Sequence, residues 1–325
     1  MKAVGQQRYG GPEVLEINEI DQPGVAGNEV LVRVRAASVN ARDWHVMRGD
    51  PYVARLMNPS MFGLRAPKQI LGTDFAGVVE AVGPEVRRLK PGDEVFGESP
   101  GAFAEYVKAP ETVVDLKPAN LTFEQAAALP LAANTALVGL RDVAQLKPGQ
   151  QLVINGASGG VGTFAVQIAK ALDAKVTAVC STKKVDLART LGADEVVDYT
   201  KEDFTRQQYD VVLDLVGNRT LADLRRAVTP HGTVILSGGG VFRGGSVFGP
   251  VGLILRGVLL SRFVSQRIVT FDGKPSAANL ATLRSMAEAR QLIPAIDRTY
   301  PLAETAAAIR YVETEHARAK VIITA

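Results

Sequence analysis

The chain has 325 residues, of which 46% are hydrophobic and 22% are charged, an ordinary composition for a globular protein. Its 37 basic and 34 acidic side chains leave a net charge of +3 and form no long basic run, so the charge pattern does not favour nucleic-acid binding. The single cysteine, Cys180, excludes an intrachain disulfide and a metal site built from several cysteines.

The length favours two domains, because one hydrophobic core rarely organises more than about 300 residues. The first residues lack the apolar core of a secretory signal, so we expect a cytoplasmic protein. The most apolar segment, residues 249–264, is too short to span a bilayer and is interrupted by Arg256 and Arg262. We expect a buried or interface helix there; the alternative is a flap over an apolar pocket or a membrane-touching face.

The sequence of the first hundred or so residues predicts short strands joined by turns. Residues 29–39 alternate apolar and polar side chains, as a half-buried strand does. Residues 90–97 contain a Pro-Gly-Asp turn that leads into a strand, and residues 101–109 predict another strand. This part of the chain therefore predicts an irregular β domain.

The pattern changes at residues 121–140, which are rich in alanine and predict helix, with Thr122 and Gln125 as a capping box. From residue 150 onward, apolar runs typical of buried strands alternate with helical segments. This alternation predicts an α/β fold with a parallel sheet covered on both faces. Residues 276–325 add two helical segments and a closing strand. The expected strands of the sheet are 150–156, 175–181, 194–199, 209–217 and 232–239, with helices at 162–172, 183–193 and 219–228.

Residues 154–170, INGASGGVGTFAVQIAK, place a glycine-rich turn between an expected strand and an expected helix. Gly159 and Gly162 fill the second and third glycine positions of the dinucleotide-binding pattern G-x-G-x-x-G, whereas Ala157 fills the first. Small residues let the backbone approach a pyrophosphate, which then meets the helix N-terminus. The alternative is a turn that merely packs. The expected cofactor-binding residues of this turn are Gly156, Ala157, Ser158, Gly159, Gly160, Val161 and Gly162.

The end of the second expected strand distinguishes NADPH from NADH. An NAD-binding domain carries a carboxylate there for the ribose 2′-hydroxyl, but this chain has Ser181, Thr182, Lys183 and Lys184. Hydroxyl and ammonium groups suit a 2′-phosphate, so we predict that NADPH is the cofactor. The alternative is that both lysines are solvated residues at the start of the next helix.

Two further segments follow strands at the carboxyl edge of the sheet, where ligands bind in this fold. Gly217 and Asn218 follow the fourth strand, and Ser237, Gly238 and Gly239 follow the fifth. We expect these five residues to contact the cofactor as well.

Several stretches together resemble the medium-chain dehydrogenase/reductase superfamily over essentially the whole chain. They are SVNARDWHVMRG (38–49), ILGTDFAGVVEAVGPEV (70–86), LKPGDEVFG (89–97), LPLAANTAL (129–137), INGASGGVG (154–162) and LGADEVVDY (191–199). The resemblance implies a GroES-like β domain of residues 1–121 and 273–325, with a Rossmann doubly wound parallel sheet in residues 122–272. It also implies a homodimer, in which the sixth strand of this sheet, near QRIVTFDG, pairs with its copy.

Zinc alcohol dehydrogenases of this superfamily carry a cysteine at the position of Asn40 and a His-Glu pair at the positions of Thr73 and Asp74. The four-cysteine structural zinc lobe is also absent from the chain, so no metal is expected. The sequence most resembles the zinc-free quinone oxidoreductase branch, whose members use NADPH to reduce quinones or the C=C bond of enones. Such conjugated acceptors delocalise the charge that hydride addition creates, so they need no Lewis acid.

The resemblance also implies roles for single residues. Asn40 is expected near the nicotinamide and the substrate, and Asp43 is expected to support that loop, whereas Asp74 is expected to be structural. His45 stands where many relatives carry tyrosine, either as a proton donor or as an ordinary hydrogen-bonding residue. Tyr52 is a further catalytic candidate, and it begins an apparent insertion, residues 51–69, that is able to fold over the cleft. On the cofactor side, Thr135, Phe271 and Lys320 are expected near the nicotinamide, and Tyr199 beside the adenosine.

Two other functions remain open from the sequence. One is an NADPH-binding structural or redox-sensing protein with little catalysis, because fold and loop alone do not establish turnover. The other, which the missing ligands disfavour, is a zinc alcohol dehydrogenase.

Overall fold

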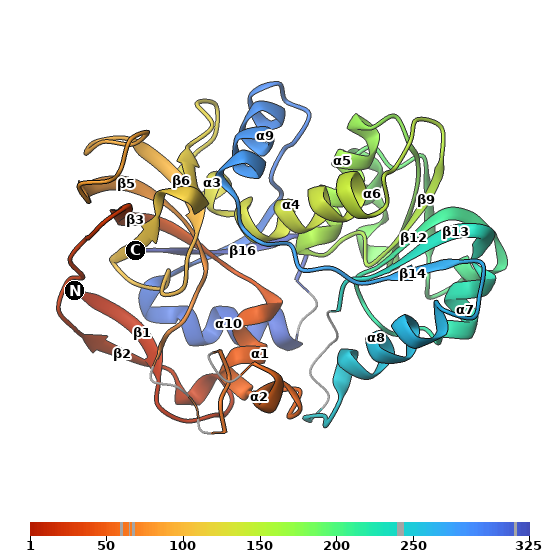
Figure 1. The fold of residues 1–325 in the computed structure, drawn as a ribbon, viewed down its shortest axis with the longest axis horizontal. Helices are drawn as coiled ribbons and strands as arrows, with labels where there is room; N and C mark the ends of the chain where they lie inside the picture. Colours follow the sequence, from red (N-terminus) through yellow and green to blue (C-terminus); the bar gives the residue numbers. More distant parts are fainter. Residues whose placement is uncertain (59–60, 65, 67–68, 239–243, 315–316) are drawn as a thin grey trace. The chain divides into compact units, whose positions relative to one another are not determined.

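Two units make up the structure, a computed structural model that describes residues 1–58, 61–64, 66, 69–238, 244–314 and 317–325 (Figure 1). The first unit comprises Met1–Asn134 and Lys274–Ala325, and the second comprises Thr135–Gly273. The expected α/β class, a GroES-like domain with a parallel Rossmann sheet, is confirmed. Residues 122–134, assigned above to the nucleotide-binding domain, cluster instead with the first unit.

The first unit is built on a seven-stranded sheet in the order β15-β16-β3-β5-β6-β8, with β7 also paired to β3. The alternating pattern of residues 29–39 forms the central strand β3, as predicted. Of residues 101–109 only the last part is strand. A separate three-stranded sheet has the order β2-β1-β4. The strands are β1 (Lys2–Gln6), β2 (Glu16–Glu19), β3 (Glu29–Val39), β4 (Gln69–Ile70), β5 (Asp74–Val82), β6 (Glu94–Glu98), β7 (Tyr106–Pro110), β8 (Val114–Leu116), β15 (Ile296–Pro301) and β16 (Lys320–Thr324).

The helices of the first unit begin at positions that the sequence marks. At the start of α3 the hydroxyl of Thr122 accepts a hydrogen bond from the amide of Gln125 at 3.2 Å, and the Gln125 side chain accepts one from the amide of Thr122 at 3.0 Å. The predicted capping box is therefore present. The helices are α1 (Ala41–Arg48), α2 (Ala54–Met57), α3 (Phe123–Ala127), α9 (Ala277–Glu288) and α10 (Thr305–Thr314), and α4 (Pro130–Leu137) begins in the first unit and ends in the second.

Strand register brings polar residues from distant parts of the chain to one end of the seven-stranded sheet. Ser38 near the end of β3 lies opposite Asp74 at the start of β5, and Asp74 lies opposite Glu98 at the end of β6. Val321 of β16 pairs with Val39 of β3. Lys320 and Asn40, their chain neighbours, consequently reach the same end of the sheet.

The second unit contains a six-stranded parallel sheet in the order β11-β10-β9-β12-β13-β14. The strand order reverses between β9 and β12, which is the point where a doubly wound sheet binds its ligand. Helices α5 and α6 cover one face and α7 and α8 the other (Figure 1). The elements are β9 (Gln151–Asn155), α5 (Gly160–Ala171), β10 (Lys175–Cys180), α6 (Val185–Thr190), β11 (Glu195–Asp198), β12 (Tyr209–Asp214), α7 (Leu221–Arg226), β13 (Val228–Leu236), α8 (Gly249–Leu260) and β14 (Arg267–Val269).

The first twelve residues of the apolar segment 249–264 form α8, which is packed on one side and exposed on the other. Gly257 faces the sheet, where a side-chain Cβ would come within 2.8 Å of Leu236 and 3.0 Å of Ile268. Leu255, Leu259 and Phe263, by contrast, are more than half exposed. No helix in the described part of the chain is long and apolar enough to cross a membrane.

Candidate functional site

The glycine-rich turn of the second unit lies between β9 and the N-terminus of α5. Gly159 precedes the helix in an extended conformation, and Gly160, Val161 and Gly162 form its first turn. The first amides of a helix lack intrahelical acceptors and lie at the positive end of its dipole. In a helix of 12 residues this arrangement fits a bound pyrophosphate.

Two glycines of this turn are required by the space and the backbone around them. A Cβ on Gly162 would lie 2.2 Å from the carbonyl oxygen of Gly156 and 2.6 Å from the Cα of Ala157. Gly156 itself has a φ of +92°, which disfavours any residue with a side chain. A Cβ on Gly159 would have a single neighbour within 4 Å, at 3.5 Å, so that side of the turn is open. The turn thus has the close packing and the free backbone surface that a dinucleotide needs.

The residues expected at the 2′-phosphate follow β10. Thr182, Lys183 and Lys184 form a short 3₁₀ helix with Ser181 as its N-cap residue. Thr182 and Lys183 are exposed, whereas Lys184 is partly buried. Tyr199, expected beside the adenosine, directly follows β11 and is half exposed.

A carboxylate that the sequence analysis did not include lies next to this group. Asp198 at the end of β11 accepts a hydrogen bond of 2.5 Å from the Thr182 hydroxyl and one of 2.7 Å from the Thr200 hydroxyl. These hydrogen bonds and the nearby Lys201 lower the pKa of Asp198 to about 2. Asp198 is therefore a fixed negative charge beside Thr182. The position of Asp198 at the end of a strand is the feature of the sequence that could have indicated it.

The loop after β12 is fixed by a buried polar network. The Asp214 carboxylate accepts hydrogen bonds from the Asn155 side chain at 2.8 Å and from the Gly217 amide at 3.1 Å. The same Asn155 side chain donates to Asn218 at 2.9 Å. Burial raises the pKa of Asp214, and these donors oppose that rise. Asn155 and Asp214, which the sequence analysis missed, thus hold Gly217 and Asn218 in place.

Gly217 and Asn218 also line a cavity of about 460 Å³ together with residues of α7 and α8. Two guanidinium groups, those of Arg219 and Arg256, belong to the same lining. After β13, the Ser237 amide donates to the Asp214 carbonyl at 3.1 Å, and Gly238 has a φ of +71°. Gly239 lies outside the described residues.

Thr135 and Phe271 lie close together within the second unit. A Cβ added to Gly273 would be 3.4 Å from Thr135 and 3.8 Å from the Phe271 ring. The ring also covers Gly139, where a Cβ would approach it to 3.0 Å.

Lys320, expected near the nicotinamide, is 2% exposed and belongs to a buried network in the first unit. Its ammonium donates a hydrogen bond of 2.6 Å to the Asn40 side-chain oxygen and lies 3.5 Å from the Asp74 carboxylate. The Asn40 side-chain NH₂ donates to Asp74 at 3.0 Å, as does the Ser38 hydroxyl. Burial raises the pKa of Asp74 and lowers that of Lys320, and the opposite charge of each partner counteracts the shift.

Asp43 lies in the first turn of α1 and is 3% exposed. Its carboxylate accepts a hydrogen bond of 2.7 Å from the Asn40 amide, which fixes the loop that carries Asn40. Burial, aided by the charge of Asp74, raises the pKa of Asp43 to about 7, although the Asn40 amide and Lys320 act in the opposite direction. Asp43 is thus a carboxyl group that changes its charge near neutral pH.

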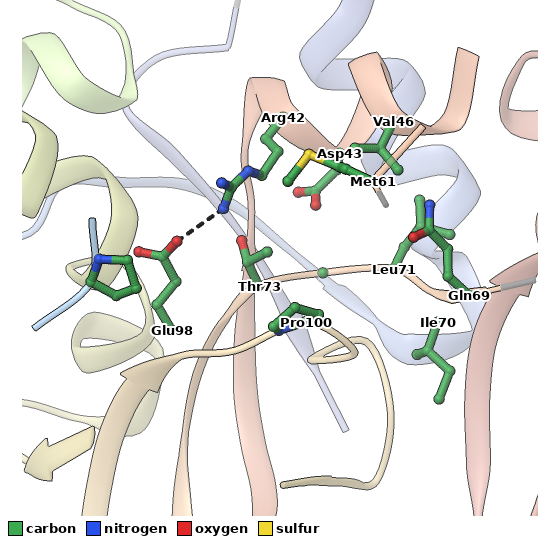
Figure 2. A pocket seen from close by; sticks show the side chains of 12 residues that line it. Arg42, Asp43, Val46, Met61, Gln69, Ile70, Leu71, Thr73, Glu98 and Pro100 are labelled. Atoms are coloured by element: carbon green, nitrogen blue, oxygen red, sulfur yellow. Dashed lines mark hydrogen bonds and ion pairs between the residues drawn. The ribbon is translucent and has the colours of Figure 1, made fainter. Parts of the chain in front are cut away.

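A cavity of about 400 Å³ borders this network, and Figure 2 shows the side chains that line it. Asp43, Arg42, Glu98 and Thr73 form its polar part, and the Arg42 guanidinium donates to the Glu98 carboxylate at 2.9 Å. The remaining wall is largely apolar. It consists of Val46, Met61, Gln69, Ile70, Leu71, Gly72, Pro100 and Pro275.

His45 and Tyr52 are not among the residues that line this cavity. The Nδ1 atom of His45 lies 2.6 Å from the Asp50 carbonyl oxygen, and its ring stacks on Trp44 at a centroid distance of 3.6 Å. Tyr52 is 48% exposed, with the Arg55 guanidinium 4.9 Å above its ring. The segment 51–69, expected to cover the cleft, lies partly outside the described residues.

The residues at the zinc-ligand positions do not fit a catalytic zinc ion. Asn40 and Asp74 are hydrogen-bonded to each other, and a lysine ammonium lies 3.5 Å from the Asp74 carboxylate, where it would repel a cation. Among the residues that the structure describes, no three His, Cys, Asp or Glu side chains are grouped to hold a metal ion.

Comparison with known proteins agrees with this architecture. Residues 26–119 match the family model of the alcohol dehydrogenase GroES-like domain, and residues 191–323 match that of the zinc-binding dehydrogenases. The NADPH-dependent alkenal/one oxidoreductase of Arabidopsis thaliana is 36% identical over 340 residues, which cover 99% of this chain and 79% of that protein. The 2-methylene-furan-3-one reductase of Solanum lycopersicum is 34% identical with the same coverage, 99% and 79%.

The structure of Escherichia coli quinone oxidoreductase complexed with NADPH matches with a TM-score of 0.85 and 26% identity, and covers 100% of both chains. The sequence motifs, the overall fold and these relatives all agree. The chain therefore belongs to the medium-chain dehydrogenase/reductase superfamily, in the branch that contains the quinone oxidoreductases and the enone reductases.

Proposed function

We propose that this protein is an NADPH-dependent, zinc-independent oxidoreductase that reduces a quinone or an α,β-unsaturated carbonyl compound. The observation that carries the proposal is the glycine-rich turn before α5, in a chain whose zinc-ligand positions hold Asn40, Thr73 and Asp74. The named activities of the Arabidopsis and Escherichia coli relatives support it.

When bound, NADPH supplies a hydride to the conjugated acceptor. The chain has to bind the cofactor, orient the acceptor, exclude water and stabilise the oxygen that gains negative charge. The glycine-rich turn and the residues after β10, β12 and β13 would hold the dinucleotide. Asn40, fixed by Lys320 and Asp43, and the cavity beside them would serve the acceptor. His45 and Tyr52, the proton-donor candidates of the sequence analysis, do not line that cavity, so solvent would supply the proton.

The test is NADPH oxidation by chelator-treated protein with an ortho-quinone, a para-quinone, an enone and a simple ketone. Turnover with a quinone or the enone, but not with the ketone, is the expected result. Tight NADPH binding without turnover on any acceptor would instead favour a structural or redox-sensing protein. Stoichiometric zinc whose removal abolishes activity would favour a zinc alcohol dehydrogenase.

The preference for NADPH is expected to depend on Lys183 and Lys184. Changing both to glutamate should lower the ratio of kcat/KM for NADPH to that for NADH by about 100-fold, because two charge-assisted contacts to the 2′-phosphate are lost. Asp198 nearby carries a fixed negative charge that would repel the 2′-phosphate, so the positive charges of the two lysines are needed to bind it. The measurement is steady-state kinetics with both cofactors.

A matched control for this variant changes Lys147 and Lys175 to glutamate. Both are exposed; Lys147 precedes β9 and Lys175 is the first residue of β10, so both lie at the amino ends of these strands, away from the cofactor edge of the same sheet. The control carries the same charge change and should keep its NADPH preference. An unchanged preference in the Lys183 and Lys184 variant would contradict the assignment.

We also propose that two chains associate through β14. This strand lies at the edge of the six-stranded sheet, and the exposed apolar residues Leu255 and Leu259 of the adjacent α8 and Phe263 just after it lie nearby in the chain. An edge strand beside an exposed apolar surface favours aggregation, and pairing with a second copy of the chain would cover both. Sedimentation equilibrium is expected to give a dimer, and a monomer at micromolar concentration would refute the pairing.

A further inference from the structure

Thr73 presents a hydroxyl whose hydrogen-bonding capacity is unused within the protein. The residue is 9% exposed, and its Oγ atom is buried without a hydrogen-bond partner in the ranges that the structure describes. A buried hydroxyl without a partner costs about 1–3 kcal/mol. Such groups are rare in folded proteins, and a ligand is one physical reason to retain one.

The backbone around Thr73 is fixed from both sides. Gly72 has a φ of +85°, and a Cβ there would lie 2.5 Å from the Phe103 ring. The Gly72 carbonyl accepts a hydrogen bond from the Gly101 amide at 2.9 Å, and the Thr73 carbonyl accepts one from the Ser99 amide at 2.8 Å. Asp74 then enters β5. The hydroxyl is therefore attached to a backbone with little freedom to move, as a preorganised donor requires.

Thr73 belongs to the residues that line the 400 Å³ cavity described above, and its hydroxyl is buried in the wall. Figure 2 shows its oxygen directed to the side of the cavity where Arg42 and Asp43 lie. Those neighbours are already engaged, because Arg42 donates to Glu98 at 2.9 Å and Asp43 accepts from the Asn40 amide at 2.7 Å. The wall beyond them is mostly apolar. The cavity therefore suits a molecule with an apolar body and an oxygen that accepts a hydrogen bond.

We propose that the Thr73 hydroxyl donates a hydrogen bond to the carbonyl oxygen of the acceptor, and that the apolar wall holds the acceptor's hydrocarbon body. The proposal rests on the proposed function and assigns a catalytic residue to the same site.

An enone would be reduced by the transfer of one hydride and one proton. Hydride from NADPH forms a C–H bond at the β-carbon, the C=C electron pair moves toward the carbonyl carbon, and the C=O pair moves onto oxygen. NADPH is oxidised to NADP⁺ and the enone is reduced to an enolate, which takes a solvent proton at its α-carbon. Thr73 keeps its own proton, and its hydrogen bond strengthens as the oxygen gains charge.

The test compares Thr73→Val with Thr73→Ser, using an enone and a quinone. Valine keeps the branched shape but lacks the hydroxyl, so kcat/KM for both acceptors should fall about 10- to 100-fold. The KM for NADPH should stay unchanged. Serine should retain most of the activity, because it restores the donor.

Thermal unfolding supplies a second readout that separates this role from a structural one. Because valine removes an unpaired buried hydroxyl, Thr73→Val should unfold at a temperature equal to or above that of the wild type. If Thr73 had only a structural role, the Thr73→Val variant would instead lose both stability and activity. Gln69→Met tests the alternative donor, since Gln69 lines the same cavity and also has a buried side-chain nitrogen without a partner in the described ranges. Its kcat/KM should fall less than that of Thr73→Val.

Three outcomes would overturn the proposal. Wild-type kcat/KM in Thr73→Val removes the Thr73 assignment and leaves the proposed function intact. A loss in Gln69→Met without a loss in Thr73→Val assigns the carbonyl to Gln69 instead. Absence of wild-type turnover on every acceptor overturns the proposed function first, and the Thr73 proposal with it.

Discussion

Replacing Lys320 with methionine is expected to lower the free energy of unfolding of the first unit by about 3–5 kcal/mol. The substitution keeps the length of the side chain but leaves the Asp74 carboxylate buried without its cation, which lies 3.5 Å away in the native protein. It also removes the 2.6 Å hydrogen bond to Asn40. Urea unfolding followed by the fluorescence of Trp44, the only tryptophan, measures the change in this unit.

Lys108→Met is the matched control for that substitution. Lys108 lies 3.1 Å from Glu29 in the same sheet, but the pair is partly exposed, and it should contribute less than about 1 kcal/mol. The double variant Lys320→Met with Asp74→Asn should recover much of the loss, because no unpaired charge remains. A loss in Lys320→Met no larger than that of the control would contradict the view that this pair is tightly coupled.

The sequence predicted the parts of the fold that depend on local pattern. The alternating residues 29–39 became β3, the Thr122 capping box formed, and the apolar runs after residue 150 became a parallel sheet. In each case the signal lies within a few neighbouring residues. The glycine-rich turn could also be predicted from the sequence, because the crowding around Gly162 is a consequence of the strand–turn–helix geometry itself.

The buried network was much less accessible to sequence reasoning. Lys320 and Asn40 are 280 residues apart in the chain, and only the pairing of β16 with β3 brings them together. Lys320 was expected near the nicotinamide, but the sequence held no indication that it is 2% exposed and bonded to Asp74. Likewise, the partner of Arg42 follows from the register of β5 and β6.

The raised pKa of Asp43 is related to how the charges at this end of the sheet are paired. Three carboxyl groups, those of Asp43, Asp74 and Glu98, share one end of the sheet with two cations, Lys320 and Arg42. Arg42 pairs with Glu98 and Lys320 with Asp74. The Asp43 carboxyl accepts a hydrogen bond from the Asn40 backbone amide, and burial is the largest influence on its pKa. Stability should therefore depend on pH through this residue.

Asp43→Asn is expected to remove a pH dependence of stability between about pH 4 and pH 7. Unfolded aspartate loses its proton near pH 4, whereas native Asp43 keeps its proton until about pH 7. Between these values the native state binds more protons than the unfolded state, so the free energy of unfolding falls as pH rises. A shift of about three units corresponds to about 4 kcal/mol, fully lost above pH 7.

Urea unfolding of the wild type and of Asp43→Asn, followed through Trp44 at several pH values from 4.5 to 8, measures this difference. Asparagine keeps an oxygen able to accept the hydrogen bond from the Asn40 amide, so the loop should stay in place. The wild type should lose stability relative to the variant as pH rises, because only the wild type must ionise a carboxyl group that is 3% exposed. If the free energies of unfolding of the two proteins changed with pH in parallel, Asp43 would be ionised in the native protein over the whole pH range. Lys320 would then stabilise the charge of Asp43 in addition to that of Asp74.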